Sequence, residues 1–146
     1  MPKPHASAPA PINTLNPDHP SWPPLWREIK DPPKLVNVQG RSGVLKQPSV
    51  AIVGTRRASL RGVAFARALS FVLATRGWCV VSGMALGVDA AAHRGAIEAG
   101  GPTVAVMGTG LDRVYPAVHS GLRSEIEANG CVLTEYEAGV EPRKYH

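Results

Sequence analysis

The chain has 146 residues, which is enough for one domain with a hydrophobic core, and 44% of them are apolar. It contains no apolar run of about 18 residues that could span a bilayer, and its start, MPKPHASAPAP, lacks the apolar centre of a signal peptide. We therefore expect a cytoplasmic protein without a membrane segment. The net charge of +5 arises in residues 1–62, which hold nine Lys/Arg against three Asp/Glu, and this excess mildly favours a nucleic-acid partner.

The N-terminal part of the chain is rich in proline, since ten of the 14 prolines fall within the first 33 residues. Proline fixes φ and removes a hydrogen-bond donor, and little here can be buried, so we expect residues 1–20 to be a disordered tail. From Trp22 onward, large apolar side chains predict a lead-in segment, residues 21–48, that packs on the main domain. This segment includes a strand-like run near 34–38.

From Ser49 onward, short apolar runs alternate with helical stretches. The expected strands cover 49–53, 78–82, 103–107 and 131–134, and the expected helices lie near 60–76, 87–99 and 118–129. Ser59 is the expected N-cap of the first helix and Gly77 its stop. The alternation predicts right-handed βαβ units and hence an α/β fold, a Rossmann-like three-layer sandwich with a mainly parallel sheet, whose βα core is 49–146.

Ligands of such sheets bind beyond the carboxyl ends of the strands. In this chain those ends are followed by four segments, which we expect to converge on one site: residues 54–57, 82–87, 108–116 and the stretch from Glu135. The two cysteines, Cys79 and Cys131, lie inside apolar runs without the spacing of metal ligands. We expect buried free thiols there, with neither a disulfide nor a metal centre.

The first loop, GTRRAS, has the features of a phosphate site. Gly54 permits a tight turn and the close approach of a ligand, while Thr55 and Ser59 offer hydroxyl and N–H groups. Arg56 and Arg57 point in different directions, so we expect one of them to face a phosphate. The alternative is a plain βα turn with solvated arginines. The loop lacks the lysine and the hydroxyl of a Walker motif, which disfavours ATP hydrolysis.

The second loop, SGMALGVDAAAH, repeats the small turn at Ser82 and Gly83, and Gly87 allows a second bend before the helix. Asp89 lies in the first helical turn, where a carboxylate is favoured, and His93 follows at i+4, so the two can share a hydrogen bond. One interpretation is general-base chemistry, although no third group completes it. The favoured interpretation is that Asp89 and His93 brace the loop. The pair is two ligands short of a metal site.

The third loop, MGTGLDRVYP, brings the backbone close to the site at Gly108 and Gly110 and carries Arg113 and Tyr115. Tyr115 can stack on a base or pack within the loop, and the sequence leaves both interpretations open. The chain ends in RKYH, where Lys144 adds a basic group among aromatic ones. The alternative for so short an end is fraying.

Together these segments resemble the DprA/Smf family, the DNA-processing proteins of bacterial transformation. Five segments follow the family's order: SWPPLWREIKDPPKLVNVQG, VAIVGTRRASLRG, VVSGMALGVDAAAH, GPTVAVMGTGLDRVYP and LTEYEAGVEPRKYH. The match covers roughly 16–146, and five motifs in order are far more specific than one glycine turn. Met84, Leu86 and Val88 depart from the family's usual second motif, and Leu86 removes a polar group from the loop.

The resemblance implies a non-enzymatic protein without a cofactor that binds and protects single-stranded DNA regardless of sequence, helps load the RecA recombinase and forms homodimers. By position, Arg56 and Arg57 are expected to contact phosphates. Ser82 and Gly83 are expected to line the pocket, and Arg113, Tyr115 and Lys144 to flank it. The rival is a nucleotide-binding enzyme of the nucleoside-monophosphate glycosidase type, in which Asp89 and His93 would act. The chain lacks the P-G-G-x-G-T-x-x-E stretch in which such folds place a catalytic glutamate, which argues against the rival.

The family's domain normally continues past this point with a phenylalanine and an arginine-rich stretch, whereas this chain stops at His146. We therefore expect the sheet to be incomplete on its C-terminal side and the homodimer to be weakened.

Overall fold

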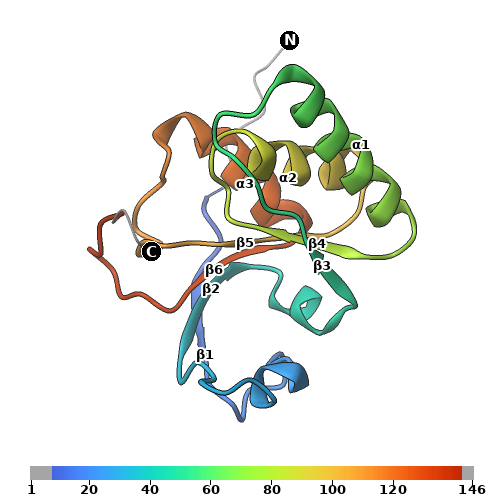
Figure 1. The fold of residues 1–146 in the computed structure, drawn as a ribbon. Helices are drawn as coiled ribbons and strands as arrows, with labels where there is room; N and C mark the ends of the chain where they lie inside the picture. Colours follow the sequence, from blue (N-terminus) through green and yellow to red (C-terminus); the bar gives the residue numbers. More distant parts are fainter. Residues whose placement is uncertain (1–7, 143–146) are drawn as a thin grey trace.

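The computed structural model describes residues 8–142 (Figure 1). Within these residues the strands are β1 (Ile12–Leu15), β2 (Val36–Gly40), β3 (Ser49–Ala51), β4 (Cys79–Ser82), β5 (Thr103–Val106) and β6 (Cys131–Thr134). The α-helices are α1 (Leu60–Thr75), α2 (Val88–Glu98) and α3 (Ser120–Asn129). Three 3₁₀ helices accompany them in the described part of the chain, η1 (Pro24–Arg27), η2 (Ser42–Lys46) and η3 (Ala117–His119).

The strands form one sheet in the order β1-β2-β6-β5-β4-β3. β3, β4, β5 and β6 are parallel, with Val80 paired to Val50 on one side and to Thr103 on the other. β1 and β2 join antiparallel, and β2 pairs with β6. The predicted α/β fold with a mainly parallel sheet is confirmed.

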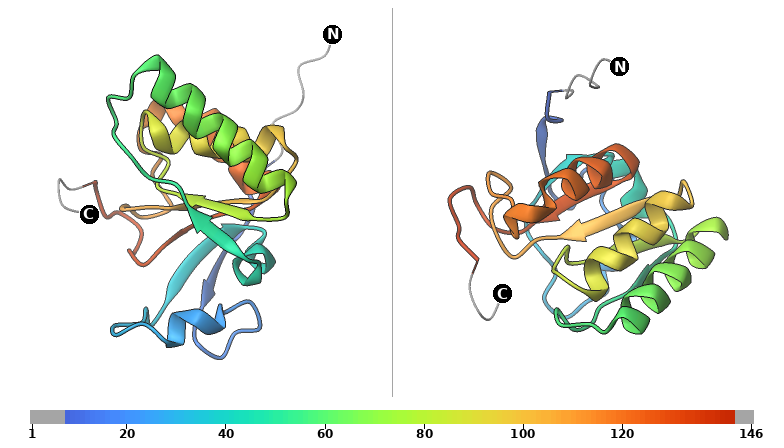
Figure 2. Two further views of the ribbon diagram at one scale, coloured as in Figure 1. Left: turned by 45° about the vertical axis from the view of Figure 1, so that its right-hand side comes forward. Right: turned by 90° about the horizontal axis from the view of Figure 1, so that it is seen from above.

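All three α-helices lie on one face of the sheet, side by side (Figures 1 and 2). Each of them connects neighbouring parallel strands, and the chain steps across the sheet in one direction from β3 to β6. Because right-handed crossovers that step in one direction always return over the same face, the common side follows from the strand order. The carboxyl ends of these four strands consequently share one edge.

The first helix begins and ends where the sequence predicts. The Ser59 hydroxyl accepts a hydrogen bond from the Gly62 N–H at 3.1 Å, which caps the N-terminus of α1. After Thr75 the chain turns at Gly77, whose φ of +86° is in the left-handed region that favours glycine. α1 packs closely on α2 because Gly95 has no side chain: a Cβ there would meet the Arg67 carbonyl oxygen at 2.2 Å.

The opposite face of the sheet is covered by the lead-in segment, which supplies the second covering layer. Strand residues alternate between the two faces, so Val80 contacts the helices while Cys79 faces the lead-in. Trp22 and Trp26 pack edge to face in this layer, with ring centroids 5.0 Å apart. Burial raises the pKa of Cys79 to about 11, and the thiols of Cys79 and Cys131 are free, as predicted.

The prediction that residues 1–20 form a disordered tail is wrong for residues 12–15, which form β1. This strand exchanges backbone hydrogen bonds with β2, and the Leu15 side chain at its end is fully buried. The Thr14 hydroxyl donates to Asn37 Oδ1 at 2.7 Å across the pair. Proline dominates the composition on both sides of INTL, and the pairing depends on β2, which lies more than twenty residues away. Residues 1–7 are outside the described part.

Candidate nucleic-acid interface

The first two glycine turns pack directly on each other at the carboxyl edge of the sheet. Gly87 has a φ of +78°, and a Cβ at this position would meet the Thr55 carbonyl oxygen at 2.3 Å. The Val88 N–H donates to the same Thr55 oxygen at 3.3 Å. On the other side of the contact, a Cβ at Gly54 would lie 2.8 Å from the Val88 side chain. The two turns therefore form one unit, and both glycines are required for their close approach.

Hydroxyl groups within the first turn hold its backbone. Thr55 Oγ1 accepts from the Arg57 N–H at 3.1 Å, and Ser59 caps α1 as described above. α1 then begins at Leu60, three residues after Arg57.

The second turn is held from three directions. Asp89 Oδ2 accepts from the Gly83 N–H at 3.2 Å. Met84 has a φ of +60°, an unusual conformation for a residue with a side chain, and its carbonyl oxygen lies 2.8 Å from His119 Nδ1. Because a carbonyl can only accept, His119 must carry its proton on Nδ1. Ser82 donates its hydroxyl to the Ile52 carbonyl at 2.7 Å and is buried, which corrects the expectation that it lines the pocket.

His93 is not part of this site. It is fully buried, and its Nδ1 lies 2.7 Å from the Thr103 hydroxyl, which in turn donates to the Val80 carbonyl. The hydroxyl proton is thereby used, so His93 donates through Nδ1 and its Nε2 is unprotonated. Burial, with a smaller contribution from His119, lowers the pKa of His93 to about 3. Within the described residues Asp89 and His93 do not share a hydrogen bond, so the expected pairing is wrong. The His93 ring is instead hydrogen-bonded to Thr103 on β5.

All four loops meet at one cavity of about 570 Å³. Figure 1 shows the loop after β5 and the segment after β6 on the same side of the molecule. The cavity is lined by Arg56, Gly83, Ala85, Leu86, Asp89, Val106, Met107, Gly108, Thr109, Tyr115, Pro116, Leu133, Glu135, Tyr136 and Pro142. The convergence follows from the parallel order of the strands, whose carboxyl ends share this edge.

The predicted arginines differ in their placement. Among the described residues, Arg56 is the cation that lines the cavity, while Arg57 lies outside the lining. Arg113 also lies outside it, and its guanidinium pairs with Glu141 at 3.4 Å. Lys144 falls outside the described residues.

The cavity also contains groups that the sequence interpretation missed. Tyr136 is the second residue after β6, and an aromatic residue just past the carboxyl end of a parallel strand is a signal that could have identified it. Tyr136 lines the cavity together with Tyr115, which is half exposed. Asp89 and Glu135 add two carboxylates to the lining that contains Arg56. The lining thus combines one cation with two carboxylates and two tyrosines.

The loop 108–116 is tied to the chain after β6. A Cβ at Gly110 would meet the Glu137 carbonyl oxygen at 2.4 Å, and the Gly110 N–H donates to Val140. The Asp112 carboxylate accepts from the Gly139 N–H at 2.9 Å. Two of the cavity's walls thus depend on each other.

The described residues contain no helix long and apolar enough to cross a membrane. They also contain no group of three or more His, Cys, Asp or Glu side chains placed to hold a metal ion.

These features define an α/β protein with a cavity at the carboxyl edge of its parallel strands, and comparison with known proteins identifies its family. The family model for DNA recombination-mediator protein A matches residues 13–146, so the chain belongs to this family. The predicted resemblance is confirmed.

Two relatives show how much of the family's length is present. Protein Smf of Synechocystis sp. is 40% identical over 134 residues, which cover 89% of this chain and 34% of the relative. The DNA processing protein DprA of Streptococcus pneumoniae is 41% identical over 119 residues, covering 82% of this chain and 42% of the relative. The chain thus spans between a third and a half of these relatives.

Two solved structures share the fold. The crystal structure of Streptococcus pneumoniae DprA matches with a TM-score of 0.86 at 37% identity, over 92% of this chain and 47% of that one. A Helicobacter pylori DprA structure, described as showing a single-stranded DNA binding mode, matches with a TM-score of 0.81 at 34% identity, over 92% of this chain and 60% of that one.

Proposed function

We propose that this chain binds single-stranded DNA without sequence preference, at the cavity where the four loops meet. The observation that carries the proposal is that one arginine and two tyrosines line the same cavity. Arg56 neutralises a backbone phosphate, and Tyr115 and Tyr136 offer faces on which bases stack. Stacking tolerates every base, so this arrangement binds without reading sequence. The described Helicobacter pylori relative supports the choice of ligand.

The two carboxylates in the cavity favour one orientation of the bound DNA strand. Asp89 and Glu135 repel phosphates, so the backbone runs along the Arg56 side and the bases turn toward the tyrosines. We further propose that Arg57, Arg113 and Lys144 contact neighbouring phosphates outside the cavity. We propose a non-enzymatic role, which is supported by the burial of His93 and its absence from the cavity lining.

We propose that the protein acts in the cytoplasm as a homodimer. There it protects single-stranded DNA taken up in transformation and helps RecA load onto it. Membership of the DNA recombination-mediator family supports this role. RecA filament growth on an oligonucleotide should accelerate when the chain is added, and sedimentation should show a dimer. Unchanged filament growth would contradict the recombinase role.

Fluorescence anisotropy with a labelled dT oligonucleotide tests the DNA proposal. Affinity should fall as salt rises, and Arg56→Ala should make the slope of log K against log salt less negative by about 0.7, the value for one phosphate contact on a single strand. Arg76→Ala is the matched control, because Arg76 lies beyond the other end of α1 and should leave the slope unchanged.

Binding that does not respond to salt, or equal effects of the two variants, would overturn the proposal. The enzyme alternative makes a separate prediction. Chromatography after incubation with AMP should show no free base, and base release that Asp89→Ala abolishes would establish a glycosidase instead.

A further inference from the structure

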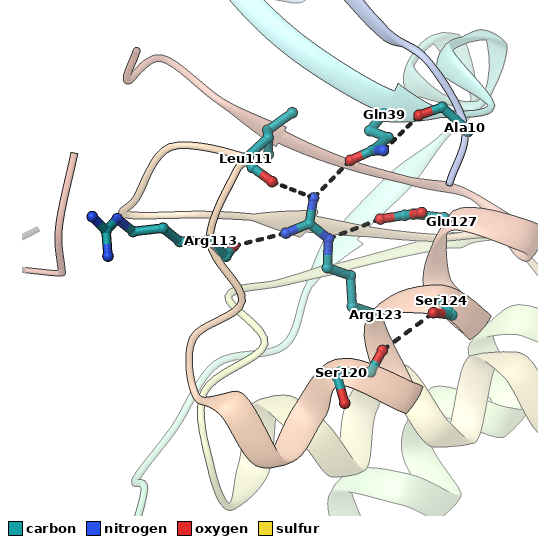
Figure 3. A network of polar contacts seen from close by, with 8 residues as sticks. All are labelled: Ala10, Gln39, Leu111, Arg113, Ser120, Arg123, Ser124 and Glu127. Carbon is teal, nitrogen blue, oxygen red and sulfur yellow. Dashed lines mark hydrogen bonds and ion pairs between the residues drawn. The ribbon is translucent and has the colours of Figure 1, made fainter. Parts of the chain in front are cut away.

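A buried arginine outside the cavity makes contacts to four different groups. Arg123 lies on α3 with only 6% of its surface exposed. Its Nε donates to Glu127 Oε1 at 2.8 Å, and its Nη1 donates to the Arg113 carbonyl at 2.7 Å. Its Nη2 donates both to the Leu111 carbonyl at 2.8 Å and to Gln39 Oε1 at 2.7 Å (Figure 3). We call these groups the Arg123 clamp.

The clamp has one charge pair and several neutral acceptors. Glu127, one helical turn after Arg123, supplies the carboxylate, and both side chains are nearly buried. A buried guanidinium is costly to desolvate, so it persists only where its donors find acceptors. Two of those acceptors are backbone carbonyls of the loop 108–116, at Leu111 and Arg113. A loop has no regular ladder to satisfy such carbonyls, and here α3 supplies the donors.

The clamp reaches beyond α3 and the loop. Gln39 on β2 accepts from Arg123 through Oε1 and donates through Nε2 to the Ala10 carbonyl. The loop, α3, β2 and the segment before β1 are therefore joined through one guanidinium and one amide. In Figure 3 the Arg113 side chain points away from the clamp, and only its carbonyl faces Arg123.

We infer that Arg123 is a positioning residue for single-stranded DNA, acting by fixing the loop that carries Tyr115. This inference rests on the proposed function. Arg123 itself is absent from the cavity lining, whereas Tyr115 and Pro116 lie in it two and three residues after the clamped Arg113 carbonyl. Fixing that carbonyl limits the orientations of the tyrosine ring, which reduces the entropy lost when a base stacks on it.

The inference is tested with a double variant, Arg123→Met with Glu127→Met. It removes both charges together and keeps apolar volume in their place, so no unpaired buried charge prevents folding. Arg67→Met with Glu98→Met is the matched control, because that pair joins α1 to α2 away from the loop. Circular dichroism should show both variants folded.

Hydrogen exchange without DNA measures the clamp itself. Backbone amides of residues 111–115 should exchange at least about tenfold faster in the Arg123/Glu127 variant and at the wild-type rate in the control. DNA binding measures its consequence. The affinity should fall by about tenfold, as expected for one weakened stacking contact, while the salt slope stays at the wild-type value.

Coupling to the tyrosine distinguishes positioning from a general structural role. Tyr115→Ala should weaken binding in the wild type but have little further effect in the Arg123/Glu127 variant. Unchanged loop exchange in the folded variant, or additive effects with Tyr115→Ala, would overturn the inference. If the wild type binds no oligonucleotide, the proposed function fails and the positioning role fails with it, although the exchange rates still report whether Arg123 orders the loop.

Discussion

The first turn, residues 54–59, and the loop 108–116 both contribute walls to the cavity, but they are held in place in different ways. The first turn is fixed by backbone packing. Gly87 lies against the Thr55 carbonyl, and there is no room between them for a side chain at position 87. The loop 108–116 is fixed by a side chain, the Arg123 guanidinium, that reaches it from a helix. Backbone packing fails when atoms are added, whereas a side-chain clamp fails when atoms are removed.

The largest loss of stability should come from removing only one partner of the Arg123–Glu127 charge pair. Arg123→Met alone leaves Glu127 buried without its cation and should lower the free energy of unfolding by about 3–5 kcal/mol. Adding Glu127→Met should recover most of that loss. Urea unfolding followed by circular dichroism measures both variants. Equal stability of the single and double variants would mean that the charge pair does not govern this region.

Adding one methyl group at Gly87 should destabilise the packing of the first turn. Gly87→Ala should lower the free energy of unfolding by roughly 2–4 kcal/mol, because the Cβ meets the Thr55 carbonyl and the backbone is in the left-handed region. Gly77→Ala is the matched control, since its φ of +86° is similar but nothing lies within 4 Å of a Cβ there. The control should lose only about 1–2 kcal/mol. Thermal melts that give equal losses would show that conformation, not packing, fixes this turn.

Acid should lower the free energy of unfolding through His93, which lies on α2, the helix that follows Gly87. Its folded pKa of about 3 is below the ordinary value of 6.5, so the unfolded chain binds the proton more readily. The stability contribution is complete above pH 6.5 and is lost as the pH falls toward 3, by up to about 1.4 kcal/mol per pH unit. Urea midpoints measured between pH 7 and 4 should show this slope, and a folded His93→Gln variant should show a shallower one. Parallel slopes would contradict the assignment.

The smallest effect is expected from Arg57, in comparison with Arg56 in the same turn. Arg57 lies outside the cavity lining while Arg56 is part of it. Arg57→Ala should therefore reduce the affinity for a dT oligonucleotide by about threefold or less, compared with about tenfold for Arg56→Ala. Competition binding at fixed salt gives both values. A larger loss for Arg57→Ala would move the phosphate outside the cavity.

The same contrast explains what could be predicted from the sequence. The cap at Ser59 and the stop at Gly77 depend on neighbouring residues, and both were predicted correctly. The convergence of four loops followed from strand order alone. The Arg123 clamp was missed because Gln39 lies 84 residues from Arg123 in the chain, and only the i+4 spacing to Glu127 is visible locally. The strand β1 was missed because it pairs with β2, more than twenty residues away. The Thr103 partner of His93 was missed because the contact joins a helix to the following strand, ten residues on, and no helical or strand spacing reveals it.

The hydrogen bond from Gln39 to the Ala10 carbonyl has a practical consequence for producing the protein. Ala10 lies in the proline-rich stretch that a protein engineer would trim or replace with an affinity tag. A recombinant version that starts after residue 10 would leave the Gln39 amide without this acceptor, in the group that holds the loop 108–116. Measurements of DNA binding are therefore best made with a cleavable tag attached at least a few residues before Ala10.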